Sequence, residues 1–488
     1  MSSVVANRRT KIVATIGPAT CSRENLEKAI RAGMNVARLN FSHGNHKDHL
    51  AVIQHIRELS ISLAAPVAIL QDLQGPKIRV GKLKDGRVEL KEGDVVKIST
   101  TLEMGDEKVL TTDFKELPES CVEGTRILLD DGLLELSVTQ VAAEEVTCKV
   151  IYGGILKDRK GMNLPGARLP VDCLTEKDLE DLEFGLANNV DYVALSFVRH
   201  GDDIKKLREI IESKNPGTRI IAKIEMLEAI ENLEEIVTLS DAVMVARGDL
   251  AVEVGQTQLP LNQKKIISLC NSLGRPVITA TQMLDSMVEN PRPTRAEITD
   301  VANAVLDGSD ALMLSAESAS GKYPFKCIQT MHEIILEVER TGSFYYNISL
   351  DNEFMGIAES IGASASLSAL KLHAPVIVCF STTGKTAMQI ANFRPHAQII
   401  AATHVPETLN RLELVWGIQT LLVNRYKTSE EAMEQIERML VQYGICKPGD
   451  NIIVTMGLPV QQGAKTNTMR VYTVSDQQAP KGKKPLRF

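Results

Sequence analysis

Short apolar segments recur along the chain and alternate with amphipathic ones. Eight of them have the continuous Val, Ile, Leu and Ala content typical of strands buried on both faces. These segments are 11–16, 35–41, 67–73, 192–197, 220–225, 242–246, 276–281 and 311–316. Between them, capping-box sequences at Thr175 and Thr294 predict helix starts. Strands that alternate with helices pair in parallel, so eight such units predict a closed (β/α)8 TIM barrel.

One interval between predicted strands is far longer than a usual loop. The third strand is expected to end near Leu73 and the fourth to begin near Tyr192. This interval contains short alternating segments, separated by turns such as Asp131-Gly132, at 88–91, 95–98, 127–129, 134–138 and 146–150. The pattern predicts a small inserted all-β domain, placed where a lid over the barrel mouth would lie.

A third region follows the last predicted barrel strand. It contains a predicted helix at 354–370 and predicted strands at 376–380, 399–403, 420–423, 452–455 and 470–474. Helical segments between these strands predict an open α/β sheet. The expected domains are the barrel at 1–73 and 174–343, the β-barrel lid at 74–173, and a C-terminal α/β domain at 344–488.

Composition narrows the class of protein. The 488 residues include 55 Lys and Arg against 62 Asp and Glu, a net charge of −7, which argues against nucleic acid or an anionic membrane as the main partner. No apolar run is long enough to span a membrane, and no export signal is recognisable at the N-terminus. Eight scattered cysteines without a CxxC spacing fit a reducing compartment, so we expect a cytoplasmic protein.

Polar residues follow the predicted barrel strands. In a TIM barrel the carboxyl ends of all strands meet at one rim, where function resides. Taken singly, each residue has the alternative interpretation of a solvated strand end or a structural ion pair. Together they predict a site, because buried charges are costly unless they are paired or bound to a ligand. The set comprises Arg38, Asn40, Ser42, His43, Asp72, Lys223, Glu225, Arg247, Asp249, Thr281, Ser315 and Glu317.

The residue types indicate the chemistry. Glu225 and Asp249 are carboxylates on neighbouring predicted strands and suit Mg²⁺, which binds through one or two carboxylates and keeps positions for water and substrate oxygens. Arg38 and Lys223 add cations at the same rim. Two acids and two bases would suit a phosphorylated carboxylate that approaches a divalent metal, and the Thr281 hydroxyl could relay a proton.

Long strings of residues resemble the pyruvate kinase family over nearly the whole chain. They are TKIVATIGPAT, GMNVARLNFSHG, LQDLQGPKIRVG, DRKGMNLPGA, IIAKIE, VMVARGDL, PVITATQML, NPRPTRAEITDVANAV and MLSAESASGKYP. The resemblance implies a barrel with a β lid, a C-terminal regulatory domain and a homotetramer. It also implies transfer of the phosphoryl group of phosphoenolpyruvate to ADP, giving pyruvate and ATP, with Mg²⁺, or Mn²⁺ as an alternative, as the metal.

The resemblance also implies roles for individual residues. Arg38 would bind the substrate phosphate, Lys223 would stabilise the phosphoryl group in transfer, and Thr281 would lie on the proton path. Glu225 and Asp249 would hold the metal, and the backbone N–H groups of Gly248 and Asp249 would receive the substrate carboxylate. The residues that would contact the nucleotide are Asn40, Phe41, Ser42, His43, Arg79 and Lys160, the last carried on the closing lid.

At one position the chain departs from the commoner family pattern. Many members bind a monovalent cation through counterparts of Asn40, Ser42, Asp72 and Leu73, and have a glutamate at the position of Lys77. Here the ammonium group of Lys77 replaces that carboxylate, so we expect a K⁺-independent enzyme. The alternative is a solvent-exposed lysine at the lid hinge.

A loop in the third region has the small-residue form of a phosphate nest, although it lacks the glycine spacing of a Walker A motif. The family uses this loop for a phosphorylated effector, and the alternative is an ordinary helix cap. Its residues are Ser381, Thr382, Thr383, Gly384, Lys385 and Thr386. The sequence does not name the effector.

Two other functions are alternatives to the kinase. A metal-dependent aldolase or lyase acting on pyruvate-like enolates would explain Glu225 and Asp249 but leaves Arg79, Lys160 and the lid without a role. A catalytically silent metabolite sensor would work through the C-terminal domain, and the intact set of rim residues argues against it.

Overall fold

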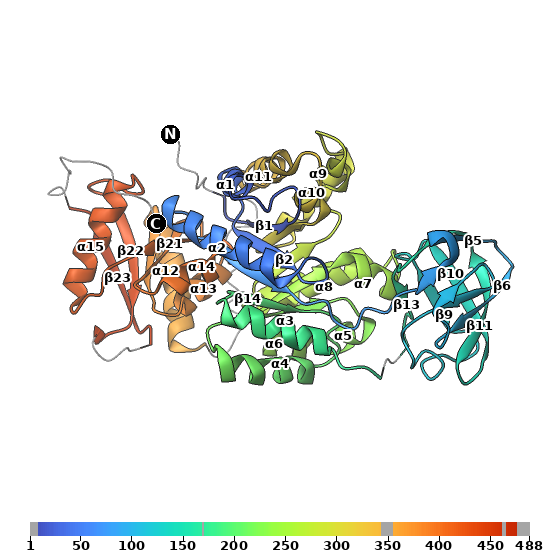
Figure 1. Ribbon diagram of the computed structural model, residues 1–488. Helices are drawn as coiled ribbons and strands as arrows, with labels where there is room; N and C mark the ends of the chain where they lie inside the picture. The colour runs from blue at the N-terminus through green and yellow to red at the C-terminus, as the bar shows by residue number, and fades with distance from the viewer. Residues whose placement is uncertain (1–7, 168–169, 343–354, 461–464, 476–488) are drawn as a thin grey trace.

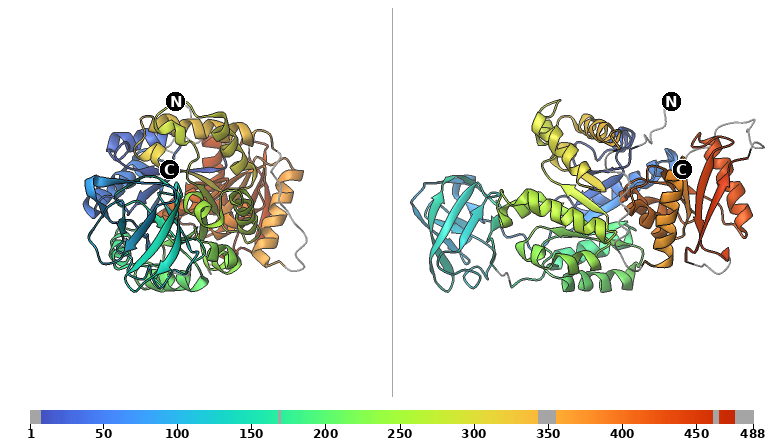
Figure 2. Two further views of the ribbon diagram at one scale, coloured as in Figure 1. Left: turned by 90° about the vertical axis from the view of Figure 1, so that its right-hand side faces the viewer. Right: turned by 180° about the vertical axis from the view of Figure 1, so that it is seen from behind.

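The computed structural model describes residues 8–167, 170–342, 355–460 and 465–475. Three bodies lie in a row, with the β lid at one end, the barrel in the middle and the C-terminal domain at the other end (Figure 1). Turning the molecule shows the same order from behind (Figure 2). The lid and the C-terminal domain therefore cover opposite ends of the barrel.

Eight parallel strands close into the predicted barrel, with β18 paired to β1. Their apolar residues belong to two clusters, one shared with the surrounding helices and one formed almost entirely by the strands themselves. In spatial order they are β1 (Lys11–Ile16), β2 (Val36–Asn40), β3 (Ala68–Asp72), β14 (Tyr192–Leu195), β15 (Arg219–Ile224), β16 (Ala242–Ala246), β17 (Val277–Ala280) and β18 (Ala311–Leu314). Each predicted strand is present, with ends within two residues of the expected ones.

Helices connect successive barrel strands and cover their outer face. The predicted capping boxes at Thr175 and Thr294 are both formed, and they begin α3 and α9. The helical segments of the barrel are α1 (Arg23–Ala32), α2 (His46–Ser62), α3 (Glu176–Ala187), α4 (Gly201–Lys214), α5 (Leu227–Glu231), α6 (Leu233–Leu239), α7 (Arg247–Val254), α8 (Leu259–Ser272), η2 (Asp285–Val288), α9 (Arg295–Leu306), α10 (Ala316–Ala319) and α11 (Pro324–Glu339).

The lid has its own hydrophobic core, separate from that of the barrel. The five predicted strands are present as β5 (Arg87–Leu90), β6 (Val95–Ser99), β9 (Arg126–Leu129), β10 (Leu134–Val141) and β11 (Glu145–Tyr152). Five further strands were not predicted, and they are β4 (Lys82–Leu83), β7 (Met104–Gly105), β8 (Val109–Thr111), β12 (Gly154–Lys157) and β13 (Met162–Asn163). Four of these, β4, β7, β8 and β13, have only two or three residues, too few to establish an alternating pattern.

The C-terminal domain is the expected open sheet, in the order β21-β20-β19-β22-β23, with only β23 antiparallel to its neighbour. Its elements are α12 (Ile357–Lys371), β19 (Val376–Phe380), α13 (Lys385–Asn392), β20 (Gln398–Thr403), α14 (Pro406–Arg411), η3 (Leu412–Leu414), β21 (Ile418–Leu422), α15 (Ser429–Gln442), β22 (Asn451–Met456) and β23 (Thr468–Thr473). The predicted helix start at 354 and the domain boundary at 343–344 lie outside the described residues.

The C-terminal domain packs against the amino-terminal ends of the barrel strands. Lys11, which begins β1, donates from Nζ to the backbone carbonyl of Ile418 at 2.7 Å, and Tyr192, which begins β14, donates from its hydroxyl to the carbonyl of Arg411 at 2.6 Å. The carboxyl ends of the strands therefore face the lid. In the described part of the chain no helix is both long and apolar enough to cross a bilayer.

Candidate active site

The ammonium group of Lys223 lies at the centre of the lid-facing rim. It donates to Ser196 Oγ at 2.7 Å and pairs with Glu225 Oε1 at 2.8 Å and with Asp72 Oδ1 at 3.4 Å. Burial alone would lower the pKa of Lys223, but the two carboxylates raise it above its ordinary value. Lys223 is therefore a fixed positive charge at any pH near neutrality.

Asp72 connects Lys223 to Arg38. Arg38 contacts Asp72 Oδ2 at 2.7 Å and the Thr15 hydroxyl at 3.0 Å, so the guanidinium group is held from two sides. Burial would raise the pKa of Asp72, yet Lys223 and Arg38 outweigh it and keep the pKa below its usual value. Asp72 Oδ1 is buried and accepts no hydrogen bond from the described residues. Two cations thus lie against the two oxygens of one buried carboxylate, Arg38 at Oδ2 and Lys223 at Oδ1.

Glu225 and Asp249 form the acidic side of the rim. Glu225 accepts a hydrogen bond from the backbone N–H of Phe197 at 2.8 Å. Burial raises the pKa of Glu225, and the negative charge of Asp249 raises it further, whereas Lys223 lowers it. Asp249 Oδ1 lies 3.1 Å from Lys77 Nζ. These two carboxylates repel each other, and their oxygens are the kind of ligand that a divalent cation such as Mg²⁺ prefers.

Lys77 is therefore not a freely solvated lysine. Its side chain is 26% exposed and extends from the outgoing lid connection to Asp249, a residue of the acidic pair. The sequence placed Lys77 at this hinge but did not indicate Asp249 as its partner.

Thr281 lies beside the first turn of α7 with a left-handed backbone, at a φ of 69°. Its hydroxyl donates to the carbonyl of Ala280 at 2.7 Å and accepts from the backbone N–H of Gly248 at 3.0 Å. This N–H was expected to face a substrate carboxylate, and here it binds Thr281. Arg247 contacts the Ala280 carbonyl and Asp300, so this rim arginine holds the loop in place.

Ser196 is a rim residue that the sequence analysis did not select. It follows β14, is buried, accepts from Lys223 and donates from Oγ to the carbonyl of Leu73 at 2.7 Å. Its position near the carboxyl end of the predicted strand 192–197 was the one signal in the sequence that pointed to it.

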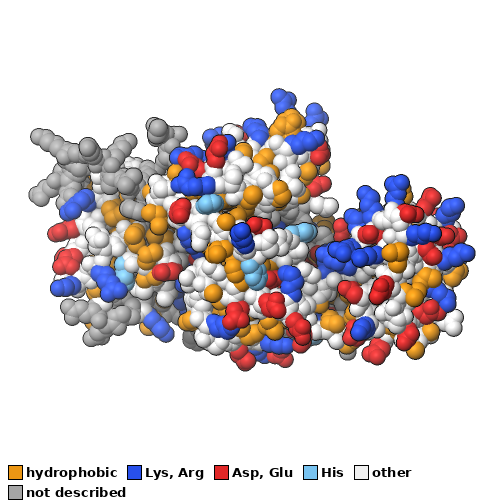
Figure 3. All heavy atoms as spheres, viewed as in Figure 1, with side chains coloured by type: hydrophobic (Ala, Val, Ile, Leu, Met, Phe, Trp, Pro, Cys, Tyr) orange, Lys and Arg blue, Asp and Glu red, His pale blue; other side chains and the backbone are white. Residues whose placement is uncertain are grey.

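The predicted nucleotide residues fall into two groups. The first group lies at the end of β2. Asn40 Oδ1 accepts a hydrogen bond from the Ser42 backbone N–H at 3.1 Å, and Asn40 Nδ2 lies 3.3 Å from His43 Nδ1. The side chain of Phe41, between them in the sequence, is buried. On the lid, Arg79 donates to the Arg159 carbonyl and Lys160 pairs with Asp130 at 2.8 Å. The side chains of Arg79 and Lys160 make these contacts within the lid. Lys and Arg side chains gather where the lid adjoins the barrel (Figure 3).

The loop at 381–386 joins β19 to α13. Ser381 Oγ accepts from the Gly384 backbone N–H at 3.0 Å, and Thr386 hydrogen-bonds to Thr466. Gly384 has a φ of 78°, and a Cβ there would lie 2.7 Å from Leu412, so glycine is required. Thr382, Thr383 and Lys385 remain exposed at the carboxyl end of the sheet, where ligands of open α/β domains bind.

The rim combines two carboxylates, a buried ammonium group, a guanidinium group and a hydroxyl, and Lys and Arg side chains gather where the lid adjoins the barrel. Side chains of these types can neutralise anionic oxygens and hold a metal, which is the requirement of phosphoryl transfer. The fold and the site define the class of protein as a metal-dependent phosphotransferase built on a TIM barrel.

Comparisons with known proteins identify the family. The pyruvate kinase barrel domain matches residues 7–328 and the pyruvate kinase alpha/beta domain matches residues 359–472. Pyruvate kinases from Staphylococcus aureus strains MRSA252 and USA300 are each 44% identical over 474 residues, covering 96% of this chain and 81% of theirs. The crystal structure of a pyruvate kinase from Cryptosporidium parvum is 36% identical, with a TM-score of 0.90 over 97% of this chain and 98% of that chain.

The chain belongs to the pyruvate kinase family, the glycolytic enzymes that transfer the phosphoryl group of phosphoenolpyruvate to ADP. The resemblance seen in the sequence is thereby confirmed, as is the fold class. Members of this family generally require Mg²⁺ and usually K⁺.

Proposed function

We propose that the lid-facing rim of the barrel carries out the family reaction, with Lys223 as the group that stabilises the phosphoryl group during transfer. The observation that carries this proposal is the placement of Lys223 Nζ within 3.4 Å of Asp72, Glu225 and Ser196. A fixed ammonium group aimed at developing negative charge lowers the barrier without reorganising during the reaction.

The other rim residues take complementary roles. Arg38, held by Asp72 and Thr15, binds the substrate phosphate. Thr281 lies on the proton path to the enolpyruvate left after transfer, and α7 presents backbone N–H groups at Gly248 and Asp249 to the substrate carboxylate. Binding a carboxylate at Gly248 requires the Thr281 hydroxyl to give up its present hydrogen bond.

Glu225 and Asp249 would hold the Mg²⁺ ion, with Mn²⁺ as an alternative. Their mutual repulsion supports this assignment, because a divalent cation removes it. The bound ion supplies Lewis-acid charge neutralisation at the phosphoryl oxygens.

Lys77 replaces the monovalent cation, so turnover does not require K⁺. In support, the Lys77 ammonium group lies at the rim, in contact with Asp249, and carries the charge that K⁺ would add. Asn40, Ser42, Asp72 and Leu73 remain as a vestigial cation site, and the Leu73 carbonyl accepts a hydrogen bond from Ser196.

Nucleotide binding, regulation and assembly complete the proposal. Asn40, Phe41, Ser42 and His43 contact the nucleotide from the barrel, and Arg79 and Lys160 contact it from the lid as it closes. The loop 381–386 binds a phosphorylated effector, supported by its exposed Thr and Lys residues. The chain works as a cytoplasmic homotetramer.

A coupled assay tests the reaction. We expect pyruvate to form only when phosphoenolpyruvate, ADP and Mg²⁺ are all present. Pyruvate formation from an aldol substrate without ADP would indicate an aldolase or lyase, and no turnover with intact ligand binding would indicate a sensor.

A further inference from the structure

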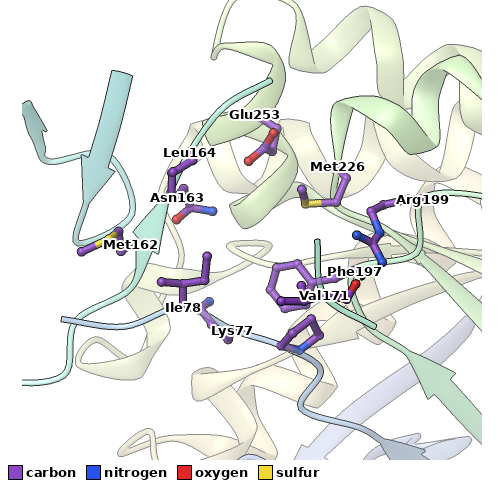
Figure 4. A pocket seen from close by; sticks show the side chains of 11 residues that line it. Lys77, Ile78, Met162, Asn163, Leu164, Val171, Phe197, Arg199, Met226 and Glu253 are labelled. Carbon is purple, nitrogen blue, oxygen red and sulfur yellow. Dashed lines mark hydrogen bonds between the residues drawn. The ribbon is translucent and has the colours of Figure 1, made fainter. Parts of the chain in front are cut away.

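The two chain connections between the lid and the barrel lie side by side. Residues 76–77 of the outgoing connection and residues 163–164 of the returning connection line the same small cavity (Figure 4). The outgoing connection also passes close to the rim, because a Cβ at Gly75 would lie 2.9 Å from the Cβ of Ser196. The lid is therefore attached to the barrel next to the proposed site.

Helix α3 begins where the returning connection ends, and its Asp178 holds both connections. The buried Asp178 carboxylate accepts from the backbone N–H of Gly75 at 3.1 Å through Oδ1. Through Oδ2 it accepts from the backbone N–H of Thr175 at 3.0 Å and from the Thr175 hydroxyl at 2.6 Å. The outgoing and returning segments are thus bound to one carboxylate in the first turn of α3.

Three residues further along α3, Asp181 holds the loop that follows β2. Its side chain is 5% exposed, Oδ1 lies 2.6 Å from Nε2 of His46, and Oδ2 pairs with Lys177 Nζ. The Lys177 ammonium group also donates to the backbone carbonyl of Phe41 at 2.8 Å. One buried carboxylate therefore holds both ends of the loop 41–46, directly at His46 and through Lys177 at Phe41.

Ring packing attaches the same loop to the same helix. Phe184 of α3 stacks on His46 with 4.3 Å between the ring centroids, and its ring lies 6.0 Å from that of Phe41. Phe41 in turn stacks on His49 of α2 at 4.2 Å. Stacked and tilted rings at these distances attract one another, so the loop is held by apolar as well as polar contacts.

We propose that Asp181 is a positioning residue for the nucleotide, which attaches the loop 41–46 to the helix that also carries both lid connections. This inference rests on the proposed function, in which residues 40–43 contact the nucleotide from the barrel and Arg79 and Lys160 contact it from the lid. A loop that is already fixed in its binding conformation loses less conformational freedom when the ligand binds.

The effect should be specific to the nucleotide. The groups proposed to act on phosphoenolpyruvate are held by other partners, Arg38 by Asp72 and Thr15 and Lys223 by Glu225. Loss of the Asp181 attachment should therefore weaken binding of ADP and leave binding of phosphoenolpyruvate nearly unchanged.

Asp181→Asn keeps the size of the side chain and removes its charge. We expect the KM for ADP to rise about fivefold, the factor that corresponds to one ordinary hydrogen bond. The KM for phosphoenolpyruvate should change less than about twofold and kcat less than about threefold, a split that general destabilisation would not produce. Glu183→Gln is the matched control, because it neutralises an exposed carboxylate of the same helix that pairs with Lys214.

Lys177→Met tests the same attachment at a half-exposed side chain, where the substitution does not disturb the core. Two measurements without turnover apply to it. Hydrogen–deuterium exchange should show protection of residues 41–44 reduced about fivefold, with strand β11 of the lid unchanged, and calorimetry should show the affinity for ADP reduced by about the same factor. Lys177→Arg keeps the charge and the donors, so it should restore both.

These measurements separate the inference from the proposed reaction. Wild-type protein that forms no pyruvate from phosphoenolpyruvate, ADP and Mg²⁺ would overturn the reaction alone, since exchange and calorimetry need no turnover. The positioning role is overturned if Lys177→Met keeps the wild-type exchange at 41–44 or the wild-type affinity for ADP, or if a folded Asp181→Asn keeps the wild-type KM for ADP.

Discussion

A buried lysine that contacts two carboxylates has a charge that does not titrate near neutral pH. Lys223 has this environment, and the role proposed for it is to stabilise the transition state rather than to bind substrate. We expect Lys223→Met to lower kcat at least about a thousandfold while the KM for phosphoenolpyruvate changes less than about threefold. Steady-state kinetics measure both, and Lys205→Met on the exposed face of α4 is the control. A wild-type kcat in Lys223→Met would remove Lys223 from the mechanism.

The second prediction at the residue scale concerns Lys77 and the requirement for K⁺. A K⁺ ion within 4 Å of its ammonium group would meet a repulsion of about 4 kcal/mol at an effective dielectric of 20, so its occupancy should be low. The measurement is the initial rate in tetramethylammonium buffer with Mg²⁺, with and without roughly 100 mM KCl, a salt concentration at which the Debye length is about 10 Å. We expect the added KCl to change the initial rate less than about threefold.

Replacement of Lys77 by glutamate should restore K⁺ dependence, because the carboxylate removes the internal cation and adds a ligand. Lys77→Gln removes the charge alone and separates these two effects. A wild-type rate that collapses without K⁺ would show that Lys77 does not replace the ion.

At the scale of elements, the loop between β19 and α13 places Lys385 at the first position of the helix, with its side chain exposed. A phosphate bound there would gain both the N–H groups of the loop and the lysine charge. We expect Lys385→Glu to abolish activation by phosphorylated effectors and to leave the unactivated rate within about twofold, since allosteric coupling is separate from the catalytic site.

The measurement is the rate with and without a panel of sugar phosphates and nucleoside monophosphates. Lys371→Glu at the end of α12 introduces the same charge change elsewhere in this domain and should respond as wild type. Equal activation of Lys385→Glu and wild type would assign the loop to helix capping alone.

At the scale of the whole molecule, a polar network joins the start of the chain to the barrel and the C-terminal domain. Arg8 contacts His332 of α11 at 3.0 Å, Arg8 also bonds Asn35, and Asn35 donates to Glu413 of the C-terminal domain at 2.9 Å. Burial, with the adjacent Arg8, lowers the pKa of His332 to about 4. At a pH between about 4 and about 6.5, His332 is therefore neutral in the folded protein but charged in the unfolded chain.

The sign of the effect on stability follows from proton linkage. Between about pH 6.5 and pH 4 the unfolded state binds more protons at His332, so stability rises with pH across this window. We expect Tm to fall on acidification from pH 7 to pH 5, and to fall less in His332→Gln, whose amide oxygen can accept from Arg8. Thermal unfolding at matched protein concentration measures this, with His373→Asn as an exposed control. An equal fall in both proteins would contradict the assignment to His332.

The barrel was predictable from sequence because its signals are local. Strands covered on both faces must be apolar throughout, and helix starts such as Thr175 and Thr294 have their capping partner three residues away. The rim residues followed, since a parallel barrel brings all strand ends to one face. Lys223 and Glu225 were selected on this basis, and they lie in contact.

What the sequence by itself determined about this protein is therefore the strands of the barrel and of the C-terminal sheet, the class of fold and the family. The tertiary structure decided which groups meet: Lys77 with Asp249, and Lys223 with Ser196. Lys77 and Asp249 belong to different elements 172 positions apart, and no local periodicity relates them. Their contact depends on where the lid is seated on the closed barrel, and that seating is set by packing between distant segments, so the partners of charged side chains emerge only when the chain is folded.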